Sequence, residues 1–278
     1  MNAAGNLLRI VLVGAIAIEV AGCSSSGSGS GGSGGGGGTS PPVPPAVSLT
    51  GNYQFQTSST SAVPFTELSG FVNEEAGSTN GSYALTASLQ VQSNACFADA
   101  KVLDLGGYTK SPLSELNAFP YDSQTVTLNL SQNCTGVSLC GSYTVSGGCA
   151  DKATGTIVGT KYAALSGTFY TGASASPALH ITINQTSQGT GQGSFQVSGS
   201  MSFTGAGCLT SGTIDKVQSS LSGSSLHLVA ATDSAGGAPL TLDGTIDSGA
   251  TTLMVNSINL AGSGCLDSLN GSRLSLTQ

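Results

Sequence analysis

The amino-acid sequence predicts an all-β fold, an antiparallel sandwich or barrel built from two tandem, similar β units. Charged residues make up only 8% of the 278 residues, against about 25% in a typical soluble domain, so the charged faces of long surface helices are missing. Apolar and polar residues alternate with a period of two, as in strands with one buried and one solvated face. Clusters of Gly, Ser, Asn and Asp interrupt this pattern about every 8–12 residues, as turns do between short strands.

Residues 1–22 have the pattern of a signal peptide rather than of a folded element. Arg9 and the α-amino group give a weakly basic start. The apolar run 10–18 that follows is too short for a transmembrane helix, which needs about 20 apolar residues. We therefore expect this segment to direct export and to be removed.

The end of this segment, Val20-Ala21-Gly22-Cys23, resembles the lipobox of bacterial lipoproteins, in which an aliphatic residue and two small ones precede the modified cysteine. The resemblance implies that Cys23 carries a diacylglyceryl thioether and usually an acylated amine, with palmitate-type chains. Several acyl chains anchor a protein durably, whereas one chain binds only marginally. Glu19 departs from the usual pattern so close to the cleavage site, and an ordinary secretory signal with a coincidental cysteine is the alternative.

Residues 23–46 are predicted to form a disordered tether behind the lipid. The run 24–45 is almost entirely Gly, Ser and Pro, so it cannot bury enough apolar surface to fold. As a random coil it reaches about 25–30 Å, which would hold the body off the bilayer. Ser24 stands where an inner-membrane retention signal would more often place Asp, so the resemblance favours the outer membrane over the inner membrane.

Segments of the first half of the body recur in the second half in the same order. The matched pairs are Gly81–Val91 with Gly193–Phe203, Leu49–Tyr53 with Leu165–Phe169, and Ser142–Val145 with Ser257–Leu260. A period of about 115 residues is too long for a solenoid and indicates a duplicated β unit. We expect the two units to span residues 47–160 and 161–278, with chance alignment of Ser/Gly-rich sequence as the alternative.

The cysteines beyond Cys23 predict three disulfides, because an even number in an oxidising compartment is typical of a disulfide framework. In the register of the repeat, Cys96 and Cys149 of the first unit fall opposite Cys208 and Cys265 of the second unit. The predicted pairs are Cys96–Cys149, Cys208–Cys265 and, as a local clasp, Cys134–Cys140. The rival pairing within the first unit is Cys96–Cys134 with Cys140–Cys149. There is no C-x-x-C motif and no histidine at ligand spacing from a cysteine, so neither a metal site nor a cofactor is expected.

The two histidines, His180 and His227, both alternate with aliphatic residues and are predicted to lie on the polar face of a strand. The functional alternative is a secreted hydrolase, in which one of them would have an acid and a serine within hydrogen-bond reach in a pocket. No G-x-S-x-G elbow frames a nucleophile. Asp243 and Asp247 are interpreted as turn formers, and no enzymatic activity is expected.

The formal net charge of −7 and the seven scattered basic residues argue against nucleic-acid binding, which needs a basic surface. The sequence therefore indicates a non-catalytic, membrane-anchored lipoprotein of the cell envelope, a binding or structural module. The sequence does not identify its ligand, for which a glycan and a protein are the candidates. A third alternative is an envelope-assembly partner that uses an exposed sheet edge. A glycan site would be expected on a concave face built around exposed aromatic residues, with Tyr108, Tyr121, Tyr162 and Tyr170 as candidates.

Overall fold

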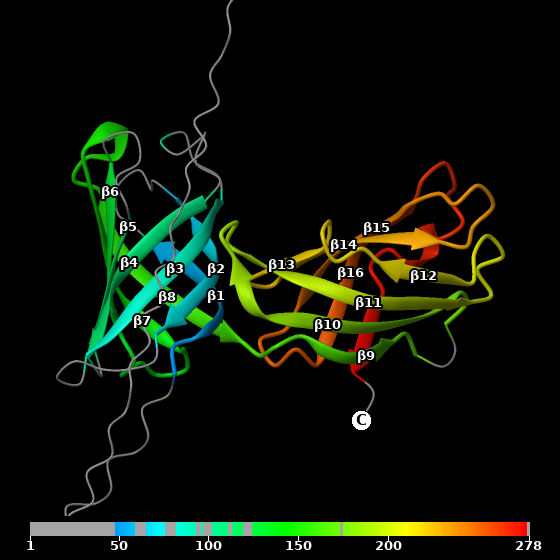
Figure 1. Cartoon of the computed structure of the whole chain (residues 1–278), viewed down its shortest axis with the longest axis horizontal. Coiled ribbons are helices and arrows are strands. Elements are labelled where there is room, and N and C mark those ends of the chain that lie inside the picture. The colour runs from blue at the N-terminus through cyan, green and yellow to red at the C-terminus, as the bar shows by residue number, and fades with distance from the viewer. Residues whose placement is uncertain are drawn as a thin grey trace, which may run out of the picture. The chain divides into compact units, whose positions relative to one another are not determined.

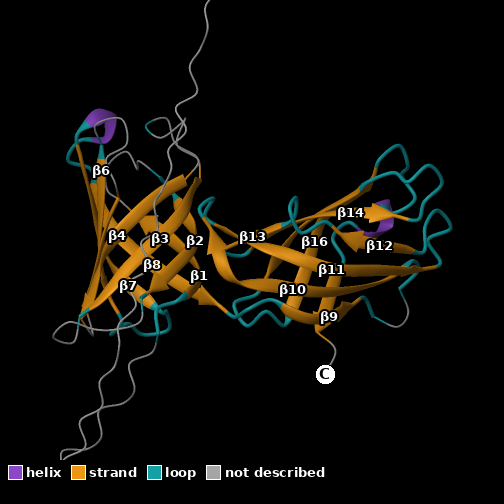
Figure 2. Ribbon diagram, viewed as in Figure 1, coloured by secondary structure: helices purple, strands orange, loops and turns teal. Residues whose placement is uncertain are grey.

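The computed structural model describes residues 48–58, 65–75, 82–92, 96, 102–110, 113–118, 124–172 and 175–276, without the side chains of Leu113, Cys149 and Gln188. The predicted signal peptide, Cys23, the tether and Tyr121 lie outside these residues. From Ser48 onward the described chain belongs to one compact unit, which consists almost entirely of strands (Figure 2). Its helices are single 3-10 turns, and none has the length or hydropathy of a membrane span.

The first eight strands form a closed antiparallel barrel, drawn from blue to green in Figure 1. Each strand pairs with the next along the chain, and the eighth returns to pair with the first. A short 3-10 helix, η1 (Gly148–Ala150), lies between the seventh and the eighth strand. The strands are β1 (Gly51–Ser58), β2 (Glu67–Glu74), β3 (Tyr83–Gln92), β4 (Val102–Lys110), β5 (Leu113–Ala118), β6 (Thr125–Ser131), β7 (Leu139–Ser146) and β8 (Thr154–Tyr162).

The remaining strands form a second antiparallel barrel. Their sheet runs in the order β10-β9-β17-β16-β15-β14-β12-β11-β13, and β10 also pairs with β11, which closes the sheet on itself. Because β12 and β13 both lie between β11 and β14, they share one of the eight strand positions. The elements are β9 (Ser166–Tyr170), β10 (Ala178–Thr190), β11 (Ser194–Thr204), β12 (Ser211–Ile214), β13 (Ser220–Ser222), β14 (Ser225–Thr232), β15 (Leu240–Ile246), β16 (Thr252–Leu260), η2 (Asp267–Leu269) and β17 (Arg273–Leu276).

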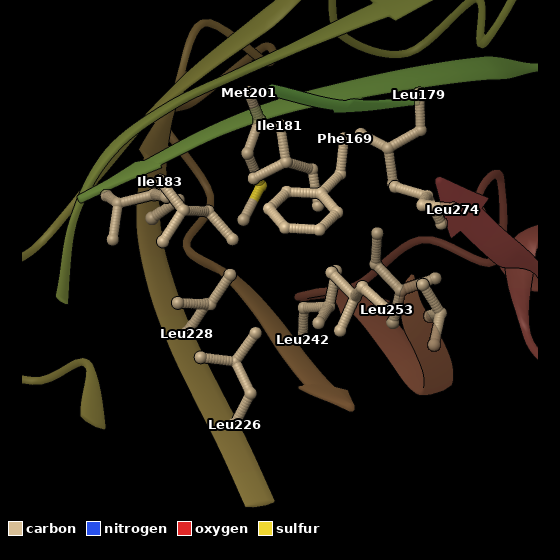
Figure 3. Close-up of a cluster of buried hydrophobic side chains, with 14 of the residues drawn as sticks. Phe169, Leu179, Ile181, Ile183, Met201, Leu226, Leu228, Leu242, Leu253 and Leu274 are labelled. Atoms are coloured by element: carbon tan, nitrogen blue, oxygen red, sulfur yellow. The ribbon is translucent and has the colours of Figure 1, made fainter. Parts of the chain in front are cut away.

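The predicted all-β fold with two similar tandem units is confirmed, and its architecture is a barrel rather than a sandwich. The alternation seen in the sequence places every second side chain of each strand inside, where apolar burial drives folding. Each barrel has its own apolar cluster. In the second barrel, side chains from facing strands point toward one another, for example Phe169 from β9, Met201 from β11 and Leu242 from β15 (Figure 3).

The segments matched in the sequence occupy equivalent places in the two barrels. The matched residues Tyr83–Val91 and Phe195–Phe203 fall on the third strands β3 and β11, and the two other matched pairs lie at the first and the seventh strands. Gly51 and Gly167, at matched positions of the first strands, both have positive φ angles of 156° and 135°. The helices η1 and η2 both lie between the seventh and the eighth strand position. The structural correspondence is that expected from a duplicated unit.

Disulfides join Cys134 to Cys140 and Cys208 to Cys265, and both pairs are among the three predicted. Cys96 is also disulfide-bonded, but the side chain of Cys149 lies outside the described residues, so the Cys96–Cys149 pairing stays a prediction. The Cys208–Cys265 bond links the loop after the third strand to the loop after the seventh strand of its barrel. It therefore crosses one end of the barrel, whereas Cys134–Cys140 closes a loop between two neighbouring strands.

Buried polar contacts join the two barrels. Asn52 of β1 is 1% exposed, and its side-chain amide pairs with the backbone of Gly223: Nδ2 donates to the carbonyl oxygen at 2.7 Å, and the Gly223 N–H donates to Oδ1 at 2.7 Å. Next to it, Phe71 of β2 meets Phe195 of β11 edge to face, with ring centroids 5.2 Å apart. A satisfied amide pair beside an aromatic contact gives the junction both specificity and apolar burial.

Candidate functional site

The structure places both histidines on outer faces of the second barrel, as the sequence predicted. His180 lies on β10, exposed, directly opposite Tyr170 of β9, and their ring centroids are 6.0 Å apart. His227 lies on β14, and its side chain is 44% exposed. Neither side chain enters the apolar interior of the barrel.

His227 belongs to a row of polar residues that crosses four strand positions of the second barrel. Ser220, His227, Asp243 and Ser257 are direct neighbours on β13, β14, β15 and β16; we call them the His227 row. Nδ1 of His227 lies 2.7 Å from Oδ1 of Asp243, and the Ser257 hydroxyl donates to Oδ2 of Asp243 at 3.2 Å. The carboxylate is therefore at the centre, bonded to both the histidine and the serine.

This order differs from that of a Ser-His-Asp triad, in which the histidine stands between the serine and the acid and takes the proton of the serine. The pair is also solvent-exposed, with the Asp243 side chain at 54%, whereas an activated nucleophile works in a water-excluded pocket. The His227 row contains the histidine, acid and serine that the hydrolase alternative requires. Their hydrogen bonds, however, link neighbouring strands and stabilise the surface of the sheet.

The interpretation of Asp243 as a turn former is wrong. Asp243 lies in the middle of β15, facing outward, and it is held there by His227 and Ser257. Asp247 does form a turn, because its carboxylate accepts the backbone N–H groups of Thr251 and Thr252, and these hydrogen bonds lower its pKa in spite of the opposing effect of desolvation. Sequence spacing alone did not separate a strand carboxylate from a turn carboxylate.

The first barrel carries an equivalent row with different chemistry. Tyr108, Glu115, Asn129 and Ser142 are direct neighbours on β4, β5, β6 and β7; we call them the Tyr108 row. Ser142 and Ser257 are matched residues of the repeat, so the two rows occupy the same place on the outer faces of the two barrels. The ring of Tyr108 and the carboxylate of Glu115 stand where the second barrel has Ser220 and His227.

A groove of about 270 Å³ lies along the Tyr108 row. Tyr108 is 51% exposed and is the only exposed aromatic residue in the described part of the chain. The groove is lined by Tyr108, Ser114, Glu115, Asn129, Leu130, Ser131, Cys140 and Gly141. It thus combines an aromatic ring with a carboxylate, an amide and hydroxyl groups, and its described lining contains no basic side chain.

The tyrosines proposed from the sequence do not form one concave face. Tyr108 lies on the first barrel, whereas Tyr170 lies on the second barrel beside His180. Tyr162, at the end of β8, is half-buried, and its hydroxyl donates to Oε1 of Gln54 at 2.7 Å. Tyr121 lies outside the described residues. Only Tyr108 has the exposure and the groove that the sequence interpretation required.

A second cavity, of about 260 Å³, lies where the chain enters the first barrel. There Nζ of Lys161 donates to the carbonyl oxygen of Ser48 at 2.8 Å and lies over the ring of Tyr53. Burial lowers the pKa of Lys161, and the nearby carboxylate of Glu74 opposes this shift. Glu74 in turn accepts the backbone N–H of Leu49 at 2.8 Å, so both charged groups are used to hold the backbone of Ser48 and Leu49.

The described strands offer no free sheet edge to a partner, because each of them pairs on both sides within its barrel. Strand addition requires unpaired N–H and C=O groups along an edge. This arrangement argues against the envelope-assembly alternative in the form that uses an exposed edge. Among the described residues, no group of His, Cys, Asp and Glu side chains could hold a metal ion.

The fold and the groove define a double β-barrel protein with a small polar site on the outer face of one barrel. Comparison with known proteins adds no relative, because no family model, no curated protein and no solved structure matches the chain.

Proposed function

We propose that this protein is a non-catalytic lipoprotein of the cell envelope, anchored through acylated Cys23, whose double barrel serves as a binding module. The proposed location in the cell envelope rests on the lipobox-like residues Val20–Cys23 and on the Gly/Ser/Pro-rich segment that follows them. The proposed membrane is the outer one.

The observation that carries the binding function is the position of the Tyr108 groove. Apolar side chains of the described residues cluster inside both barrels, so the binding site is proposed on an outer face. The groove is the one place in the described chain where an exposed aromatic ring and several polar groups converge, and this combination is typical of small binding sites. The exposed His227 row, with Asp243 at its centre, lacks the order that acyl-transfer chemistry requires.

The anchor is tested by metabolic labelling with radioactive palmitate. Wild-type protein is expected to incorporate the label and to sediment with membranes, and Cys23→Ala is expected to lose both properties. Ser24→Ala is the matched control, because it changes the neighbouring residue and should keep the label. An unlabelled wild-type protein, or a Cys23→Ala variant that is still labelled, contradicts the proposed function.

A further inference from the structure

The Tyr108 groove has a chemical character that selects among ligand classes. The ring of Tyr108 provides a flat apolar face, and Glu115, Asn129 and Ser131 surround it with hydrogen-bonding groups. An anionic ligand would meet Glu115 without a compensating basic residue in the described lining. A wholly apolar ligand would leave the carboxylate and the amide without hydrogen bonds, which is costly when water is displaced.

The carboxylate of Glu115 is oriented before any ligand arrives. The Thr127 hydroxyl donates to Oδ1 of Asn117 at 2.7 Å, and Nδ2 of Asn117 donates to Oε1 of Glu115 at 2.8 Å. This chain of hydrogen bonds runs along the outer face of β5 and β6, beside the groove. A recognition group that neighbouring side chains hold in place loses little entropy when it binds, which favours affinity and selectivity.

The backbone beneath the groove is also fixed. A Cβ atom at Gly141 would lie 1.9 Å from the carbonyl oxygen of Asn129, and one at Gly107 would lie 1.9 Å from that of Glu115. Both positions therefore need glycine for the strands to approach so closely. At the rim, the disulfide between Cys134 and Cys140 closes the loop that joins β6 to β7. The groove is consequently a shaped feature of rigid strands.

The size of the groove limits the ligand. Its volume of about 270 Å³ lies just below the range of about 300–1,000 Å³ for sites that hold drug-sized molecules. With a single exposed ring, it can stack one ligand ring at a time. A pyranose matches this site, because one face of the sugar presents C–H groups to an aromatic ring while its edges carry hydroxyls that donate to a carboxylate and accept from an amide.

We propose that the groove binds a neutral saccharide, with one sugar ring stacked on Tyr108 and its hydroxyls bonded to Glu115 and Asn129. This inference rests on the proposed binding function and names the ligand class for the same site. Binding through one stacked ring is weak for a single copy of the protein. Many anchored copies facing a polysaccharide would bind it through multivalency.

The test uses full-length Cys23→Ala protein, exported so that its disulfides form, on an array of neutral gluco-, manno-, galacto- and N-acetylglucosamine oligosaccharides. At least one of these probes is expected to bind, and its dissociation constant is then measured by calorimetry. Tyr108→Ala is expected to weaken binding about tenfold, since it removes the stacking surface, and Tyr108→Phe should bind more tightly than Tyr108→Ala. Glu115→Gln is expected to weaken binding about tenfold, because it removes a charge-assisted hydrogen bond.

The second barrel supplies the matched controls. His227→Ala and Asp243→Asn alter the equivalent row outside the groove and should leave the dissociation constant unchanged. Absence of binding to every neutral probe, or a Tyr108→Ala variant that binds like the parent, overturns the saccharide inference. Because the palmitate experiment is read independently, a labelled protein that binds no saccharide refutes this inference and leaves the anchor of the proposed function standing.

Discussion

The two barrels have the same strand order but present different chemistry outside. In the first barrel, the row across the fourth to the seventh strand contains an exposed aromatic ring beside an oriented carboxylate. In the second barrel, the same row contains His227 and Asp243, which bind each other. The two barrels therefore share the parts that close a barrel, namely the buried alternation and the matched loop cysteines, and differ on their outer faces.

The fourth strand position shows the same divergence in the backbone. In the first barrel, β4 is continuous and carries Tyr108. In the second barrel, residues 215–219 interrupt this position and separate β12 from β13. Asp215 stabilises the interruption, because its carboxylate accepts the N–H of Val217 at 2.8 Å, and Val217 itself is 82% exposed. The fourth strand position is therefore interrupted in the second barrel, where Ser220 of β13 stands in place of Tyr108.

The largest expected effect concerns two disulfides that close loops of different length, one in each barrel. Cys208–Cys265 spans 57 positions and Cys134–Cys140 spans 6. In the chain-entropy model, removal of the long link by Cys208→Ser with Cys265→Ser should lower the free energy of unfolding by about 4 kcal/mol, and removal of the short one by Cys134→Ser with Cys140→Ser by about 2 kcal/mol. Urea unfolding of both double variants measures this. Equal losses would show that strain or residual structure, rather than loop length, sets the contribution.

An intermediate effect is expected at the junction of the barrels. Asn52→Ala removes the buried amide and leaves the N–H and the C=O of Gly223 without their partners, which should cost about 2–3 kcal/mol of unfolding free energy. Asn256→Ala, at an exposed position of β16, is the matched control and should change stability by less than about 0.5 kcal/mol. If the urea midpoint of Asn52→Ala equals that of the control, the Asn52–Gly223 hydrogen bonds contribute nothing to stability.

The smallest expected effect concerns a matched interior position, Tyr143 in the first barrel and Ile258 in the second. Tyr143 is fully buried, and its hydroxyl has no hydrogen-bond partner among the described residues. Tyr143→Phe should therefore raise the free energy of unfolding by about 1 kcal/mol, since an unsatisfied buried group is removed. Ile258→Val should instead lower it by about 1 kcal/mol, because it removes a buried methyl group. Thermal unfolding measures whether each variant is more or less stable than the wild type. A destabilised Tyr143→Phe variant would show that the hydroxyl has a hydrogen-bond partner.

Much of the fold could be predicted from the sequence because it depends on local patterns. Strands such as β15 and β16 show the period-two alternation of buried and exposed residues from which the all-β fold was predicted. The register of the repeat predicted the Cys208–Cys265 pair. Alternation did not distinguish a barrel from a sandwich, since both have one buried face on each strand.

The candidate site was beyond sequence reasoning because it depends on the register between strands. Tyr108 was singled out as an aromatic candidate, but nothing in the sequence shows that Glu115 and Asn129 lie beside it. Strand pairing sets which outward residues become neighbours, and a shift of one residue would move all of them to the other face. Pairing of His227 with Asp243 was missed for the same reason. Once the strand register is known, the residues paired across the sheet from the matched serines Ser142 and Ser257 are the members of the two rows.

The hydrogen bonds from Lys161 to Ser48 and from Leu49 to Glu74 have a mechanical consequence. Tension along the chain from its N-terminal side reaches the body at these two residues, immediately before β1. Since β1 is hydrogen-bonded to β2 on one side and to β8 on the other, extraction of this strand along its axis requires both ladders to slide at once. A body loaded in this way resists shear collectively instead of peeling open one bond at a time.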